Sequence, residues 1–271
     1  MSYKVLDLFK DLPGTNCGDC GKAGCFAFAT AVYLEAYPLE RCPHLGNEAR
    51  EIAARLQADR DEGGGRKPDS SEQALEHLRG VIAEMPLDQV AARCGGTYDP
   101  GLAESVTVEF LGAPHRVLRD DVTCPGSAPT VWVKILLLIY VTRASGRPPE
   151  EDWVAFRELP NTVSKAKSFE ASAHRIADAF AGRAEQLAEA VAGVGGERIP
   201  HPSAPWAFRI RALPRVPLLL LFWDRDEEFE ARASLLVDRS VLEYLDQEGL
   251  VFLSEALAQK LRGGDLAEVI P

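Results

Sequence analysis

The sequence predicts an α+β protein in which a small helical module is joined by a linker to a larger mixed α/β domain. Three observations predict it. Four of the six cysteines and two short helical patterns fall within residues 1–58. Residues 59–71 are charged and glycine-rich and contain no large apolar side chain, which is typical of a linker. Residues 72–271 then contain strand patterns that are grouped together instead of alternating strictly with helices.

Composition limits what this chain of 271 residues can be. With 46% apolar and 26% charged residues, it can form one good-sized core and an appended module. The net charge of -11 argues against nucleic acid as a partner, because a phosphate backbone would be repelled.

The sequence also predicts a cytoplasmic protein without a transmembrane segment. The most apolar run, Val131 to Val141, contains Lys134 and is about half as long as a membrane-spanning helix. The first residues lack an apolar stretch long enough for a signal peptide. Cytoplasmic thiols stay reduced, so clustered cysteines indicate metal or redox chemistry more than disulfides.

In the first module the pattern predicts two helices. Apolar residues recur on one helical face over 26–37, and Pro38 ends that helix. A second helix is predicted from 48 to about 57, with Asn47 as its N-cap.

The larger domain is predicted to contain helices, one hairpin and a central strand. Helices are expected at 71–85, 86–94, 129–145, 167–194, 235–245 and 250–262. A hairpin is expected within 105–119, and extended segments at 152–160, 206–213 and 216–223. The segment 216–223 is apolar on both faces, so we expect it at the centre of a sheet.

The strongest motif is a cysteine quartet near the N-terminus. Its spacing is C-x2-C-x4-C-x16-C, followed directly by Pro43, and its members are Cys17, Cys20, Cys25 and Cys42. Four thiolates can ligate an iron-sulfur cube or a tetrahedral zinc ion. Structural zinc sites favour two short paired knuckles, which this spacing does not provide, so the pattern favours the cluster and leaves zinc as the alternative.

Glycines crowd the same stretch. We expect Gly18, Gly21 and Gly24 to allow positive φ and close approach of the backbone, which would aim amide N–H groups at cluster sulfurs. Such hydrogen bonds stabilise the extra negative charge that a cluster gains on reduction.

The stretch "LPGTNCGDCGKAGCFAFATAVYLEAYPLERCPHL", residues 12–45, resembles the four-cysteine iron-sulfur domain of the corrinoid iron-sulfur protein large subunit and of the B subunit of Rnf complexes. The resemblance implies a 4Fe-4S cluster on the four cysteines. In those relatives the cluster carries low-potential electrons, in one case to keep a cobalt centre active. The remainder resembles an uncharacterised domain family of anaerobic prokaryotes, on the segments "DWVAFRELP", "PRVPLLLLFWDRDEEFEA" and "VDRSVLEYL". That second resemblance implies no activity.

Other residues that could carry chemistry have simpler explanations. Cys94 and Cys124 could be a redox pair or extra ligands, but reduced structural thiols are favoured. His44 could hydrogen-bond a cluster sulfur or gate proton-coupled electron transfer, yet a surface or capping histidine is favoured. His77 and His174 lie too far apart in sequence from each other and from His115 to suggest a metal site.

The acidic run "WDRDEEFE" follows the predicted central strand, where sheet proteins often place their sites. Its carboxylates could bind magnesium or manganese or act as acid and base, although a solvated turn is favoured. They belong to Asp224, Asp226, Glu227, Glu228 and Glu230. The sequence has no GxGxxG, Walker or GxSxG motif, so nucleotide binding and serine hydrolysis have no support.

These observations favour an iron-sulfur protein that carries one electron at a time to a redox partner protein, with the larger domain as a docking platform. An enzyme is the less favoured class. The alternative is an enzyme or reductive activator that uses the cluster internally on a corrinoid or similar cofactor. The chain lacks a DxHxxG-type cobalt-ligand motif, so a corrinoid would bind without that ligand or sit on a partner protein. A third hypothesis is a zinc-folded interaction module.

Overall fold

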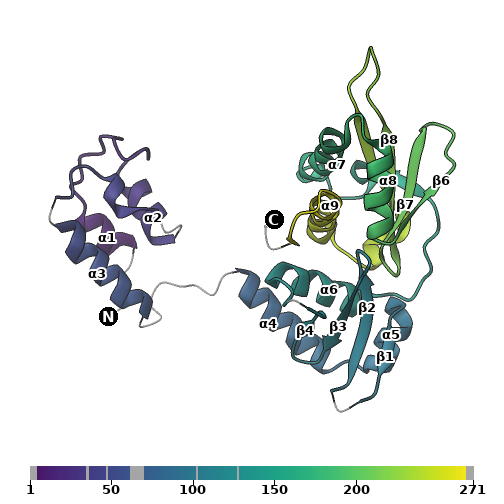
Figure 1. Cartoon of the computed structure of the whole chain (residues 1–271). Coiled ribbons are helices and arrows are strands. Elements are labelled where there is room, and N and C mark those ends of the chain that lie inside the picture. Colours follow the sequence, from purple (N-terminus) through teal and green to yellow (C-terminus); the bar gives the residue numbers. More distant parts are fainter. Residues whose placement is uncertain are drawn as a thin grey trace. The chain divides into compact units, whose positions relative to one another are not determined.

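The computed structural model describes residues 5–34, 37–46, 48–61, 70–101, 103–126 and 128–266 (Figure 1). The chain divides into two compact units, residues 1–70 and 71–271. Helices and two antiparallel sheets confirm the α+β class. Among the described residues, no helix is both long and apolar enough to span a bilayer. The functional division into 1–58 and 72–271 stays a prediction.

The first unit is helical. It contains α1 (Val5–Asp11), α2 (Cys25–Leu34), a 3-10 helix (Leu39–Arg41) and α3 (Glu48–Asp61). The two predicted helices are confirmed, whereas α1 was not expected. Helix α3 extends into the predicted linker, and the next helix begins at Ser70. Residues 62–69 of that linker and the predicted N-cap Asn47 lie outside the described residues.

A single hydrophobic core joins the helices of the first unit. Leu8 of α1, Phe28 of α2 and Ile52 of α3 are buried in it, and the thiols Cys20 and Cys25 belong to the same core. Two cysteines of the motif are therefore packed in the interior, whereas residues 13–19 of the same loop are exposed.

The second unit begins with two helices and a small sheet. Helices α4 (Ser70–Ala83) and α5 (Leu87–Cys94) precede the strands β1 (Thr97–Asp99), β2 (Ser105–Phe110), β3 (Ala113–Leu118) and β4 (Val122–Thr123). The strands pair in chain order, which confirms the predicted hairpin between β2 and β3.

The β2–β3 turn also connects the two sheets of this unit. Leu111 and Gly112 both have positive φ, 46° and 78°, which is the conformation of the two-residue turn that suits the twist of a hairpin. The N–H of Leu111 donates to the carbonyl of Ala212 in the second sheet at 3.0 Å.

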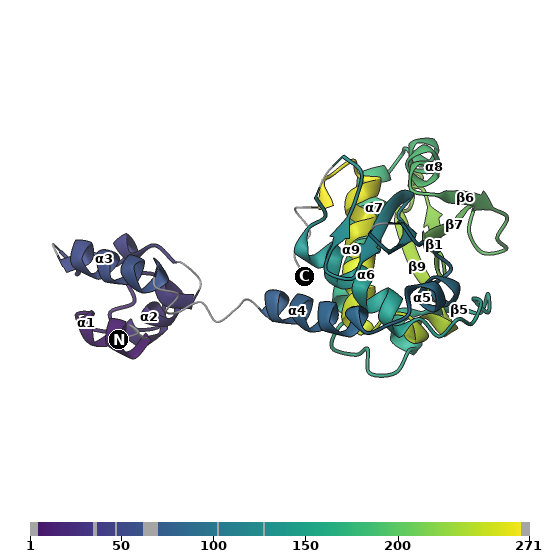
Figure 2. The same ribbon diagram turned by 90° about the horizontal axis from the view of Figure 1, so that it is seen from below.

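The larger sheet has the strand order β5-β9-β8-β7-β6. Its strands are β5 (Trp153–Ala155), β6 (Gly196–Ile199), β7 (Trp206–Leu213), β8 (Val216–Trp223) and β9 (Arg232–Asp238). Strand β8 lies in the middle and is buried over Val216–Phe222, as its two-sided apolar pattern predicts. Helices α7 (Ala166–Phe180) and α8 (Ala184–Gly193) pack against this sheet, and α9 (Gln247–Leu261) packs against α7 (Figure 2).

The predicted single helix over 167–194 is wrong. The chain instead forms α7 (Ala166–Phe180) and α8 (Ala184–Gly193). Gly182 separates them with a φ of 73°, and its N–H donates to a carboxylate oxygen of Asp224. A left-handed residue cannot continue an α-helix, so the apolar periodicity on either side belongs to two helices.

The predicted helix over 235–245 is also wrong. Leu235 to Asp238 belong to β9, which pairs with β8 on one side and β5 on the other. The chain then turns into a 3-10 helix, Arg239–Glu243. The predicted extended segment 152–160 is a strand only over Trp153–Ala155 and continues as a 3-10 helix.

The other predicted long helices are confirmed and have side-chain caps. Helix α6 (Val131–Arg143) is capped by Thr130, whose hydroxyl accepts the N–H of Val133 at 3.3 Å. Helix α9 (Gln247–Leu261) is capped by Asp246, whose carboxylate accepts the N–H of Gly249 at 2.8 Å. Each cap satisfies a backbone donor that the helix itself cannot pair.

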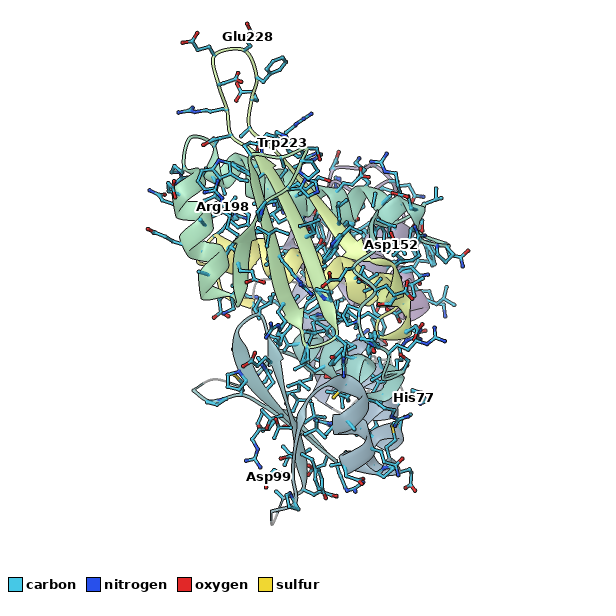
Figure 3. All side chains as sticks on the ribbon, turned by 90° about the vertical axis from the view of Figure 1, so that its right-hand side faces the viewer. His77, Asp99, Asp152, Arg198, Trp223 and Glu228 are labelled. Atoms are coloured by element: carbon cyan, nitrogen blue, oxygen red, sulfur yellow. The ribbon has the colours of Figure 1, made fainter. Side chains whose placement is uncertain are left out.

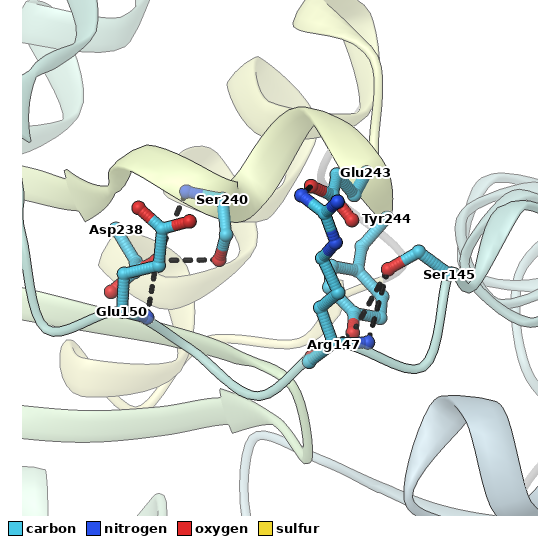
Figure 4. Close-up of polar contacts among 7 residues, drawn as sticks. All are labelled: Ser145, Arg147, Glu150, Asp238, Ser240, Glu243 and Tyr244. Carbon is cyan, nitrogen blue, oxygen red and sulfur yellow. Dashed lines mark hydrogen bonds and ion pairs between the residues drawn. The ribbon is translucent and has the colours of Figure 1, made fainter.

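A buried carboxylate organises the segment between α6 and β5 (Figure 4). Asp238 is fully buried at the end of β9. Its carboxylate accepts the backbone N–H groups of Glu150 at 3.2 Å, Glu151 at 2.7 Å and Ser240 at 3.0 Å. The Ser240 hydroxyl also donates to it, at 2.5 Å. Nearby, the hydroxyl of Tyr244 donates to the carbonyl of Arg147.

Candidate metal centre

The four cysteines of the motif lie in the loop before α2, at the start of α2 and after the 3-10 helix. Cys17 and Cys20 are in the loop, Cys25 is the first residue of α2, and Cys42 directly follows Arg41. All six cysteines of the chain fall in the described residues and are free thiols. Within the motif, Cys20 and Cys25 are buried, Cys42 is half-buried and Cys17 is exposed.

Glycine shapes the loop in two different ways. Gly18 and Gly21 have φ of 81° and 78°, and the N–H of Gly21 donates to the carbonyl of Gly18 at 2.8 Å. This tight turn confirms the positive φ expected at these two positions. Gly24 is not in the left-handed region, so the expectation is wrong there. It is needed for space instead, since a Cβ at Gly24 would lie 2.9 Å from the side-chain oxygen of Asn16.

Asn16 holds Cys25 through two hydrogen bonds. Its backbone N–H points at the sulfur of Cys25 at 3.4 Å, and its side-chain oxygen accepts the N–H of Cys25 at 2.8 Å. Asn16 has a φ of 52°, a conformation that asparagine tolerates better than most residues. This role was not expected from the sequence. The available signal was an asparagine immediately before a glycine-rich cysteine loop.

The dipole of helix α2 favours negative charge at Cys25. The positive end of a helix dipole stabilises a thiolate or another anion placed at its first residues. No acidic residue lies in the first turn of α2 to compete with such an anion.

Tyr37 fixes the Cys20 side of the loop. Its hydroxyl donates to the carbonyl of Cys20 at 3.1 Å. Its ring packs edge-to-face on Phe28 of α2, with ring centroids 6.0 Å apart. The ammonium of Lys22 lies 4.5 Å from the centre of the same ring. This role too was not expected, because the contact with Cys20 spans 17 positions of the sequence.

The exposed edge of the site carries polar groups. Nε2 of His44 lies 2.9 Å from a carboxylate oxygen of Asp19, and this hydrogen bond lowers the pKa of the Asp19 carboxyl. A hydrogen bond with Cys17 acts in the same direction. His44 is exposed, as expected for a surface histidine.

Thiol spacing distinguishes a single ion from a larger group. A tetrahedral zinc ion with bonds of about 2.3 Å holds its sulfur ligands about 3.8 Å apart. In the described part of the chain, three potential ligand atoms come within 4.8 Å of one another only at Cys17, Asp19 and His44, which include one thiol. Among the described residues, no three cysteine sulfurs come that close to one another. Four thiolates, each bound to a different iron, form the ligand set of a cube.

The acidic run after β8 forms a projecting turn, with Glu228 far out on it (Figure 3). One carboxylate oxygen of Asp226 accepts the N–H groups of Glu228 and Phe229, each at 2.8 Å. These hydrogen bonds lower the pKa of the Asp226 carboxyl. None of these acids belongs to a metal-sized group of ligand atoms among the described residues.

The remaining candidates lie in the second unit. Cys94 is completely buried, and burial raises the pKa of its thiol to about 11, which fits the expected inert structural thiol. The half-buried Cys124 thiol lies 3.7 Å from the carbonyl of Pro125. His115 is buried beside the carbonyl of Ala113 at 3.0 Å, and burial lowers the pKa of its imidazole.

The cysteine module is similar to parts of known proteins. Residues 12–44 match the family described as "Putative Fe-S cluster". The gamma subunit of the acetyl-CoA decarbonylase/synthase complex of Methanothermobacter thermautotrophicus is 38% identical over 58 residues, 21% of this chain and 13% of its own length. The corrinoid/iron-sulfur protein large subunit of Moorella thermoacetica is 41% identical over 51 residues, 19% of this chain and 11% of its own.

A third relative belongs to the ion-translocating oxidoreductase complex of Methanosarcina acetivorans. This B-type subunit is 47% identical over 53 residues, 19% of this chain and 20% of its own length. The chain thus spans at most a fifth of the length of these three relatives. No solved structure matches it.

These matches confirm the resemblance of the cysteine module, and the chain is an iron-sulfur protein. Residues 86–260, well over half of the sequence, match the family described as "Domain of unknown function (DUF3786)". The chain belongs to the DUF3786 family, in a form that carries an N-terminal iron-sulfur module.

Proposed function

We propose that Cys17, Cys20, Cys25 and Cys42 bind one 4Fe-4S cluster and that the protein is a low-potential one-electron carrier for a partner enzyme in anaerobic metabolism. The observation that carries the proposal is the loop itself, in which the free thiols of the motif accompany an Asn16 N–H that points at the Cys25 sulfur. When bound, such a cluster gains and loses one electron.

The donor set fits this group. Thiolates are the usual ligands of a cubane, and the motif supplies four of them as free cysteines. The N–H of Asn16 and the positive end of α2 both favour negative charge at Cys25. The chain therefore supplies ligands together with groups that stabilise a reduced, more negative state.

The four thiols differ in burial, and this difference indicates which side of the site a redox partner can reach. Cys20 and Cys25 face the core, whereas Cys17 is exposed beside Asp19 and His44. A redox partner would therefore approach the Cys17 edge. This geometry supports electron transfer by the module, a function that requires no catalytic residue.

A redox titration of the anaerobically purified full chain tests the function. We expect a single reversible one-electron wave near or below about -400 mV, the range of low-potential ferredoxins. A protein that binds iron and sulfide but shows no reversible wave, or shows one at positive potential, would not be this carrier.

The name of the Moorella relative supports a second candidate function. That protein is called a corrinoid/iron-sulfur protein, so this chain could serve as a reductive activator of a corrinoid protein or bind such a cofactor itself. Equilibrium titration with cobalamin tests direct binding. An unchanged cobalamin spectrum at high protein concentration would exclude direct binding of the cofactor. The chain could then act only on a corrinoid that a partner protein holds.

The Gly24→Ala variant tests the role of Asn16. The added methyl group would press on the Asn16 side chain. We expect this to displace Asn16 and so to disturb the contact between its backbone N–H and the Cys25 sulfur. Loss of one hydrogen bond worth about 1 kcal/mol should make the potential about 40 mV more negative, because that bond favours the reduced state. Protein-film voltammetry measures the shift.

Gly80→Ala is the matched control. Gly80 lies in α4, and a Cβ there would meet open space. The control should leave the potential unchanged. Equal potentials for the Gly24→Ala variant and the wild type would show that the Asn16 contact does not tune the cluster.

A further inference from the structure

A cavity of about 450 Å³, lined by both polar and apolar groups, lies between the two sheets of the second unit. The β7–β8 turn, with Pro214 and Arg215, borders one side, and Arg211 of β7 lines the same side. Strands β1 and β2 supply Thr97 and Thr107 on the other. Figure 1 shows this end of β7 and β8 beside β2 and α5.

The arginines of this cavity differ from their neighbours in having no acidic partner. Arg209, two residues earlier on β7, pairs with Glu151 at 2.8 Å. Among the described residues, neither Arg211 nor Arg215 has a carboxylate within ion-pair distance. In addition, Nε of Arg215 is buried and has no hydrogen-bond partner there. A buried donor without a hydrogen-bond partner, on a group that is always charged, lowers the stability of the folded protein. The presence of Arg215 at this position therefore needs an explanation.

The surroundings hold Arg215 in place. Its backbone N–H donates to the hydroxyl of Tyr140 at 3.0 Å, and that hydroxyl donates to the carbonyl of Cys94 at 2.5 Å. Gly95 has a φ of 73°, and a Cβ there would lie 3.2 Å from Nε of Arg215. The β7–β8 turn is therefore held against the end of α5 by contacts within the protein, without a bound ligand.

The threonines complete a set of donors. Thr97 and Thr107 are direct cross-strand partners in the β1–β2 pair, and both line the cavity. Hydroxyl groups beside two guanidinium groups can surround an oxyanion. One carboxylate, on the exposed Glu109, also lines the cavity.

We infer that this cavity binds the phosphate group of a small organic phosphate, with Arg211 and Arg215 as its charged ligands. Two guanidinium groups match the charge of a phosphate monoester or diphosphate better than that of a single carboxylate. The cavity has the size of a small-molecule site, so it can hold more than an inorganic ion. The inference does not depend on the iron-sulfur cluster.

Calorimetric titration of the full chain with pyrophosphate, at low ionic strength, tests the inference. We expect saturable binding that weakens as salt is added. Arg211→Gln and Arg215→Gln should each weaken it at least about 10-fold, the usual effect of losing a charged hydrogen bond. Glu109→Gln should tighten it about threefold, because a nearby negative charge is removed.

Arg225→Gln is the control, since Arg225 is exposed and lies outside the cavity. It should bind pyrophosphate like the wild type. No saturable binding at millimolar pyrophosphate, or an equal loss in Arg225→Gln, would overturn the inference. Circular dichroism of Arg215→Gln checks that the chain still folds, and the exposed Arg211 carries the test independently.

Discussion

The Cys25→Ala variant is expected to lose the four-iron cluster, with iron falling from about four atoms per chain to below one. Cys25 is buried, begins α2 and receives the N–H of Asn16, so a replacement ligand would have to reach the same buried position. Three remaining ligands cannot saturate four irons. Iron and sulfide analysis of the anaerobically purified variant, together with its visible absorption, measures the loss.

Cys94→Ala is the matched control for this variant. Cys94 is also a buried free thiol, but it lies in the second unit at the end of α5. Its removal should leave the iron content unchanged. If Cys25→Ala kept its full iron, or if both variants lost iron equally, the assignment of Cys25 as a ligand would be wrong. Cys25→Ser, which preserves side-chain size, separates ligand loss from disturbance of the core.

The Asp238→Ala variant is expected to lower the free energy of unfolding of the second unit by at least about 3 kcal/mol. The substitution leaves the N–H groups of Glu150, Glu151 and Ser240 without their buried acceptor. Each unsatisfied buried donor costs about 1–3 kcal/mol. The loop between α6 and β5 should loosen, because two of its N–H groups bind Asp238.

Urea unfolding followed by tryptophan fluorescence measures this effect in the full chain. All four tryptophans lie in residues 71–271, so the signal reports on the second unit alone. Asp152→Ala is the control, because Asp152 is an exposed partner of Arg239, and exposed ion pairs contribute little. Equal unfolding midpoints for the two variants would contradict the role given to Asp238.

The elements that the sequence predicted correctly are those whose signals are local. Strand β8 is apolar on both faces and lies at the centre of its sheet. The β2–β3 hairpin and helices α6 and α9 were expected for similar reasons. In each case the periodicity of a single segment is enough to indicate the burial that the structure confirms.

The errors arose where distant contacts decide the structure. Apolar periodicity runs across Gly182, but a left-handed residue bonded to Asp224 divides that stretch into α7 and α8. Residues 235–238 fit either a helix or a strand, and pairing with both β5 and β8 selects the strand. Short edge strands such as β1 and β4 carry almost no pattern of their own.

The cysteine motif of the candidate site could be recognised from the sequence, whereas the residues that support its loop could not. Four cysteines at that spacing were recognisable from the sequence alone. Asn16 and Tyr37 were not, because their roles depend on geometry. Asn16 acts through a positive φ and a contact with Cys25, nine residues away, and Tyr37 reaches Cys20 across 17 positions.

The measurement that tests the account most directly is EPR of the dithionite-reduced full chain, purified without oxygen and analysed for iron and sulfide. We expect the signal of one reduced four-iron cluster, close to one spin per chain, with about four iron and four sulfide per protein. A protein that contains zinc without sulfide and gives no signal after reduction would contradict the central claim that these four thiolates hold a redox cluster.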